Sequence, residues 1–198
     1  MSNHALLSDA INAKFEVYEW RNAIHILHSV HPDRFAEICS ALDAFILKRS
    51  YIEKAGGNKS PIAHALDEYL LAAGWEERQF DTRVLIDGVQ YDTPTHKVDC
   101  FKSRIALEVE WNNKDPFFDR DLNNFRLLYD LHVIDLGVII TRSSSLEKTL
   151  KAVGRNNTTY GKATTHFDKL WPKIKGGGAG GCPVAVFAIG PGAYRDDI

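Results

Sequence analysis

Residues 98–111 constrain the fold most strongly, because acidic and apolar side chains alternate along them: VDCFKSRIALEVEW. Successive side chains of a strand point to opposite faces, so Glu108 and Glu110 share one face. The opposite face is apolar and consists of Ile105, Leu107 and Val109. This alternation predicts a half-buried strand that carries its carboxylates on one side.

A preceding strand brings a further carboxylate, that of Asp99, to the same place. A two-residue turn at residues 102–103 would join the two strands into a hairpin. Asp99 then pairs with Ala106, and Glu108 is its diagonal neighbour, about 7–8 Å away at the backbone. Because paired residues project to the same face, Asp99 joins both glutamates on one side of the hairpin.

Carboxylates gathered on one sheet face repel one another and require positive charge nearby. A hard divalent cation is one solution, and oxygen-only ligands favour magnesium, manganese or calcium over zinc. Magnesium held by a few carboxylates can polarise a phosphoryl oxygen and acidify a bound water, as phosphodiester hydrolysis requires. The alternative is an ordinary amphipathic strand whose glutamates are neutralised by Arg104 or Lys102. The pattern alone leaves both interpretations open.

The rest of the chain predicts an α/β fold, with helices flanking a central mixed sheet. Further strands are expected over residues 15–20, 23–28, 80–86, 89–91, 133–141 and 183–189. Helices are expected over residues 32–47, 61–73, 117–131, 146–153 and 163–174. A loop is expected at 54–59, and Asp87–Gly88 is typical of a hairpin turn. With no internal repeat or linker, we expect one domain over residues 1–198.

Charge is distributed unevenly along the chain, although the net charge is only −2. Residues 141–175 carry eight basic and two acidic side chains, which makes this segment +6 and the remainder −8. Such a segment can offer a polyanion one basic face, or it can be a solvated set of helix surfaces.

The cysteines and the apolar runs bear on the cellular location. Cys39, Cys100 and Cys182 are well separated within apolar stretches, which favours buried thiols over disulfides or a zinc site. No apolar run reaches the length of a membrane helix, and the first ten residues lack a signal-peptide profile. We therefore expect a cytoplasmic protein that does not bind membranes.

The spacing Asp99-x8-Glu108-x-Glu110, on a hairpin between two helices, resembles the PD-(D/E)xK nuclease motif. Val98 stands at the proline position and Glu110 at the lysine position. The chain is similar in this respect to type II restriction endonucleases of the BglII/BstYI type. The similarity begins near Phe15, spans most of the chain and includes residues 74–77, 136–140 and 183–187.

The resemblance implies a PD-(D/E)xK restriction-endonuclease-like core and a role for each acidic residue. Asp99 and Glu108 would bind Mg²⁺, and Glu110 would orient or deprotonate the attacking water. Glu77, near the end of the upstream helix, would supply a fourth catalytic carboxylate, with Glu76 as the competing choice. Since Glu110 replaces the lysine of the motif, a lysine-assisted mechanism would require another lysine, either Lys97 or Lys114.

The resemblance also implies that two loops read DNA bases. The residues expected to bind DNA are Asn112, Asn113, Lys114, Arg142, Ser143 and Ser144. Their side chains can hydrogen-bond base edges in the major groove. The alternative is that they are turn residues or helix caps, and Ser145 in particular resembles an N-cap.

The implied activity is site-specific cleavage of double-stranded DNA by a homodimer. Two-fold symmetric sites are read by symmetric dimers in which each subunit cuts one strand. The resemblance places the helix at 117–131 in the dimer interface and points to a palindrome centred on GATC. Two alternatives stay open, namely a repair or mobile-element nuclease of the same fold and a non-catalytic DNA-binding module.

Overall fold

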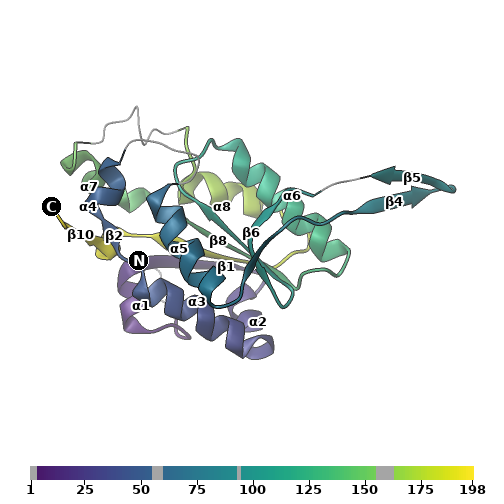
Figure 1. The fold of residues 1–198 in the computed structure, drawn as a ribbon, viewed down its shortest axis with the longest axis horizontal. Coiled ribbons are helices and arrows are strands. Elements are labelled where there is room, and N and C mark those ends of the chain that lie inside the picture. Colours follow the sequence, from purple (N-terminus) through teal and green to yellow (C-terminus); the bar gives the residue numbers. More distant parts are fainter. Residues whose placement is uncertain (1–3, 55–59, 93–94, 155–162) are drawn as a thin grey trace.

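A six-stranded mixed sheet forms the centre of the computed structural model, which describes residues 4–54, 60–92, 95–154 and 163–198 (Figure 1). In spatial order its strands are β1 (Phe15–Trp20), β9 (Val184–Ile189), β8 (Leu136–Arg142), β7 (Ile105–Glu110), β6 (Val98–Lys102) and β3 (Glu76–Arg78). Strands β7, β8 and β9 run parallel, whereas β1, β6 and β3 are antiparallel to their neighbours. The predicted mixed sheet is therefore confirmed.

Helices cover both faces of this sheet. One face packs against α1 (Asp9–Lys14), α2 (Ala23–Val30), α3 (Pro32–Ala44), α4 (Arg49–Glu53), α5 (Pro61–Ala72) and α7 (Glu147–Ala152). The other face packs against α6 (Pro116–Asp130) and α8 (Phe167–Lys175). Strand β7 separates two hydrophobic clusters: Leu107 and Val109 belong to the first, and Ala106 belongs to the second. Glu108 and Glu110 point toward the α6 side because they share the face of Ala106.

The smaller elements lie at the periphery. Strand β2 (Leu47–Lys48) pairs with β10 (Tyr194–Arg195), and two short 3₁₀ helices cover Ser144–Leu146 and Pro191–Ala193. The hairpin of β4 (Arg83–Ile86) and β5 (Val89–Asp92) projects from the body (Figure 1). Its predicted turn is confirmed, since Asp87 and Gly88 both adopt positive φ angles of 49° and 80°.

Several predicted boundaries are wrong. Residues 23–28 lie in helix α2 instead of a strand, and the helix that begins at Pro32 ends at Ala44. Strand β4 begins at Arg83 instead of residue 80, and α8 begins at Phe167 instead of residue 163. Helices α1 and α4 were not predicted. The expected loop at 54–59 lies outside the described residues except for Lys54.

Helix α5 illustrates a confirmed prediction. Ser60 caps its N-terminus by accepting a hydrogen bond from the backbone N–H of Ala63 (3.1 Å), and Pro61 occupies the first helical position. The helix ends before Gly74, whose φ of 85° suits glycine. None of the described helices is long and apolar enough to cross a bilayer.

Candidate active site

The hairpin of β6 and β7 turns one residue later than predicted. Ser103 and Arg104 occupy the turn, with positive φ angles of 47° and 69°, and Lys102 pairs with Ile105. The prediction that Asp99 pairs with Ala106 is therefore wrong, because Ala106 pairs with Phe101. The pairing moves by two residues, which preserves the face of every side chain. For this reason the prediction that Asp99 lies on the same face as the two glutamates is confirmed.

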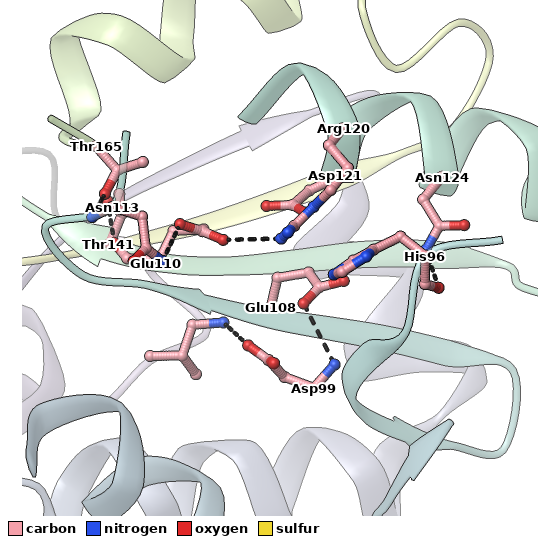
Figure 2. A network of polar contacts seen from close by, with 11 residues as sticks. His96, Asp99, Glu108, Glu110, Asn113, Arg120, Asp121, Asn124, Thr141 and Thr165 are labelled. Carbon is pink, nitrogen blue, oxygen red and sulfur yellow. Dashed lines mark hydrogen bonds and ion pairs between the residues drawn. The ribbon is translucent and has the colours of Figure 1, made fainter. Parts of the chain in front are cut away.

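Asp99 and Glu108 face each other directly in this register (Figure 2). The backbone N–H of Asp99 donates to Oε2 of Glu108 (3.3 Å), and the backbone N–H of Val109 donates to Oδ2 of Asp99 (3.0 Å). Each carboxylate is thus oriented by the backbone of the opposite strand. The arrangement fixes one oxygen of each acid and leaves the other for a further partner.

Glu108 and Glu110 are buried, with only 1% and 2% of their surfaces exposed. The basic residues considered as neutralising partners bind elsewhere. Arg104 pairs with Asp135 (2.6 Å), and Lys102 pairs with Glu37 (2.9 Å). The structure thus contradicts the alternative of an exposed amphipathic strand neutralised by these residues.

Helix α6 contributes a further carboxylate and one positively charged side chain to this cluster. Asp121 is fully buried, and its Oδ1 accepts hydrogen bonds from Nε (2.9 Å) and Nη2 (2.8 Å) of Arg120. The Nη2 atom of Arg120 also lies 3.3 Å from Oε1 of Glu110, and Asn113 donates to Oε2 of Glu110 (2.7 Å). Figure 2 shows the Arg120 side chain beside Asp121, with a dashed line from it to Glu110.

Burial and mutual repulsion shift the titration of these acids. Burial, followed by the charges of Asp121 and Asp99, raises the pKa of Glu108 well above its usual range. Burial and the neighbouring Asp121 raise the pKa of Glu110 to about 9. Burial raises the pKa of Asp121 to about 6, although Arg120 opposes this shift. Without an added cation, the cluster therefore retains protons that exposed carboxylates would release at neutral pH.

Unpartnered oxygens show that the cluster suits a hard cation. Oε1 of Glu108 and Oδ2 of Asp121 are buried and have no hydrogen-bond partner. Leaving such atoms unsatisfied is unfavourable, and carboxylate oxygens are the ligands that Mg²⁺ prefers. No three of these carboxylates place ligand atoms within 4.8 Å of one another. Among the described residues, only His4, Glu19 and His25 do so. Binding an ion between these carboxylates would require side-chain rotation.

The upstream glutamates lie on β3, the strand beside that of Asp99. Glu77 pairs with Lys97 (2.6 Å), and its side chain is about half exposed. Glu76 pairs with Arg78 (3.1 Å) and is also exposed. Each of these glutamates therefore has a basic side chain as its partner, and Lys97 is the partner of Glu77.

The two loops expected to bind DNA meet at one edge of the sheet. Strands β7 and β8 are parallel and Glu110 pairs with Thr141, so the segments that follow them emerge side by side. The backbone of Lys114 bridges to that of Thr164, and the Thr165 N–H donates to the carbonyl of Asn113 (2.8 Å). The two predicted loops therefore leave the same end of the sheet next to Glu110, and residues 164–165 lie against the first of them; loops at the carboxyl ends of parallel strands commonly form binding sites.

Side chains in the second loop already have partners within the chain. Arg142 is buried and donates to Oγ1 of Thr164 (2.8 Å), and Ser143 is buried and donates to Glu16 (2.7 Å). Ser144 lies 3.5 Å from the His166 ring and is partly exposed. Ser143, not Ser145, caps the 3₁₀ helix that begins at Ser144, so the expectation for Ser145 is wrong.

Sequence reasoning missed Asp121 and Arg120 on α6, and also Asn124, whose side chain donates to the carbonyl of His96 (3.2 Å; Figure 2). The available signal was the apolar stripe of this helix, formed by Phe118, Leu122, Phe125 and Leu128. Asp121 lies three residues after Phe118, in the middle of that stripe, and Asn124 lies beside it. A polar residue in a buried stripe is either paired or functional.

Comparison with known families agrees with this geometry. Residues 15–189 match the model of a family described as restriction endonuclease BglII/BglIII. No curated protein matches the chain.

Proposed function

The chain belongs to the restriction endonuclease family of BglII and BglIII, and on this premise we propose that it is a Mg²⁺-dependent type II enzyme. It would hydrolyse one phosphodiester bond in each strand of double-stranded DNA at a short palindrome. The family implies nuclease activity and DNA binding. The metal, the site and the residue roles are proposals of our own.

One observation supports the proposal above the others: Asp99 and Glu108 face each other across a hairpin, and Oε1 of Glu108 is buried without a partner. These two residues would hold the ion. Bound Mg²⁺ would polarise a phosphoryl oxygen and lower the pKa of a water molecule. The chain's own contribution is to position the carboxylates through backbone hydrogen bonds and to exclude bulk water from them.

Glu110 would orient the attacking water and accept its proton. In the absence of a cation its pKa is about 9, so the carboxyl holds a proton at neutral pH. Positive charge between Asp99 and Glu108 lowers that pKa and frees the carboxylate to act as a base. Asp121 and Arg120 would position Glu110, since Arg120 bridges the two acids.

Glu77 would supply a further acidic group at the edge of the site. It lies on β3, next to the strand of Asp99, and its ion pair with Lys97 brings a lysine to the same edge. Glu76 is directed to Arg78 instead, which favours Glu77 for this role. Lys97 could then stabilise negative charge on phosphate, as the lysine of the motif would.

The surface formed by the two loops would bind DNA. Asn112, Lys114 and Ser144 are partly or fully exposed there and would contact bases. Asn113, Arg142 and Ser143 would position these contacts through their hydrogen bonds to Glu110, Thr164 and Glu16. We propose a homodimer with α6 in its interface, a GATC-centred palindrome, and action in the prokaryotic cytoplasm.

Cleavage of plasmid DNA in the presence of Mg²⁺ tests this function. We expect discrete fragments from the native chain, at least a hundredfold loss of cleavage in Asp99→Ala and Glu108→Ala, and retained DNA binding in both. Binding is retained or strengthened because a negative charge facing phosphate is removed. Glu68→Ala, which removes an exposed glutamate on α5, is the matched control and should cut normally.

Other outcomes identify the alternatives. Nicks or smears from the native chain would indicate a nuclease that recognises DNA structure instead of sequence. Undiminished cleavage by Asp99→Ala would place the active site elsewhere. DNA binding without cleavage under any metal condition would favour a non-catalytic binding module.

A further inference from the structure

Three candidate metal ligands meet far from the carboxylate cluster in sequence, near the N-terminal end of the described chain. His4 precedes α1, Glu19 lies on β1, and His25 lies on α2. Nδ1 of His25 lies 3.0 Å from Oε1 of Glu19, and Nε2 of His4 lies 3.4 Å from the same oxygen. All the ligand atoms lie within 4.8 Å of one another.

The 3.4 Å separation lies in the range expected for two ligands of one tetrahedral zinc ion, and the 3.0 Å separation is a hydrogen-bond distance that zinc binding would lengthen slightly. Zinc–nitrogen and zinc–oxygen bonds of about 2.0–2.2 Å place tetrahedral ligands roughly 3.3–3.5 Å apart. Two imidazoles and one carboxylate form a donor set that suits zinc and related transition ions, whereas the oxygen-only cluster suits magnesium. The chain therefore carries two groups of ligands with different metal preferences.

Neighbouring contacts hold two of the three ligands in position. The second oxygen of Glu19, Oε2, accepts a hydrogen bond from the backbone N–H of Ile24 (3.0 Å) and also lies 3.3 Å from Nδ1 of His25. Asn12, which is buried, accepts from the backbone N–H of His4 (2.9 Å) and donates to the His4 carbonyl (3.2 Å). Supporting contacts of this kind orient metal ligands and strengthen binding.

The exposure of the ligands leaves a route for the ion. The side chain of His25 is 58% exposed, whereas those of His4 and Glu19 are 14% and 21% exposed. The two imidazole rings meet edge to face with their centroids 5.2 Å apart. One side of the group is thus enclosed by protein, and the other is open to solvent for a fourth, water ligand.

We propose that His4, Glu19 and His25 form a binding site for Zn²⁺ or a similar transition ion, separate from the carboxylate cluster. The ion would join the segment that precedes α1 to β1 and α2, in addition to contacts such as the hydrogen bond from the Ile24 N–H to Glu19 that already connect them. It would therefore stabilise the folded chain. The site does not depend on the proposed nuclease function.

Zinc titration of the full-length, metal-free chain tests the proposal, using isothermal titration calorimetry and thermal unfolding near pH 7.5. Any affinity tag is removed beforehand, because added histidines would bind zinc beside His4. The Asp99→Ala background removes one of the carboxylates proposed to hold Mg²⁺ and so weakens metal binding by the carboxylate cluster. We expect one zinc ion per chain and a rise in the melting temperature, because an ion that binds only the folded state stabilises it.

Variants of the ligands decide the result. His25→Ala and Glu19→Gln should each weaken zinc binding at least tenfold and remove most of the thermal shift. His64→Ala is the matched control. His64 is an exposed helical histidine that lies 3.8 Å from Glu68, and among the described residues no third metal ligand joins this pair. It should bind zinc normally. Failure of the parent chain to bind zinc, or unchanged binding in His25→Ala, would overturn the proposal.

Discussion

The protonation of a single residue, Glu110, couples the proposed active site to the stability of the fold. An unfolded glutamate has a pKa near 4.5, whereas burial and Asp121 raise the pKa of folded Glu110 to about 9. Between these values the folded chain holds a proton that the unfolded chain has released. The stabilisation is therefore complete below about pH 4.5 and is lost as the pH rises through 9.

This linkage predicts the behaviour of Glu110→Gln, which is neutral at every pH. Without divalent ions, the native chain should lose unfolding free energy between pH 5 and pH 9, and the variant should lose less. At pH 8 the variant should be more stable by at least about 1 kcal/mol, because one pKa unit corresponds to about 1.4 kcal/mol. Urea denaturation in EDTA at several pH values measures both curves. Parallel curves would contradict the role assigned to Glu110.

The carboxylate cluster also shows why part of the site could be predicted from the sequence and the rest could not. Glu108 and Glu110 follow strict alternation on one strand, so their common face could be predicted locally. Asp121 joins them only because α6 packs across that face, a tertiary contact that no local pattern encodes. Its position within an apolar stripe was the available signal, and sequence reasoning did not use it.

The packing of α6 on β8 depends on one glycine. A methyl group at Gly137 would lie 2.2 Å from Cδ2 of Phe125, which is closer than any side-chain contact allows. Phe125 is fully buried in the cluster between α6 and the sheet. The missing side chain at Gly137 therefore sets how closely α6, and with it Asp121, approaches β7.

Gly137→Ala should destabilise the chain by about 1–3 kcal/mol, as overpacking of a well-filled core generally does. Phe125→Leu should be destabilising by itself, but the double variant should lose less than the sum, because the smaller side chain accepts the new methyl group. Urea denaturation of the two single variants and the double variant measures this coupling. Strict additivity would show that the two residues do not limit each other.

Predictions of whole elements succeeded where capping and periodicity agreed and failed where only an apolar run was used. Ser60 and Pro61 fixed the start of α5. Residues 23–28 suggested a strand because Ile24, Ile26 and Leu27 form a short apolar run, which periodicity cannot assign. Asn22, the N-cap of this helix, is a residue type that commonly begins helices, and sequence reasoning did not use it; in the structure it adopts a left-handed conformation and makes no side-chain cap.

At the scale of the whole molecule, the uneven charge makes polyanion binding compatible with a net charge of −2. The segment 141–175 carries +6, although residues 155–162 within it, including Arg155 and Lys162, lie outside the described residues. Its described part includes the loop after β8, helix α7 and helix α8. A basic surface there would lie next to the end of the sheet that carries Glu110.

This charge distribution predicts which basic side chains contribute to the salt dependence of DNA binding. Binding to DNA of arbitrary sequence is almost entirely electrostatic, and each phosphate contact contributes about 0.9 to the slope of log affinity against log salt. Lys148→Ala, which removes an exposed charge on α7, should weaken binding and reduce that slope by about 1. Arg21→Ala removes an exposed charge outside the basic segment and should leave the slope unchanged. Fluorescence anisotropy measures both slopes in the Asp99→Ala background, in which we expect no cleavage. Equal slopes for Lys148→Ala and Arg21→Ala would show that α7 is not part of the DNA-binding surface.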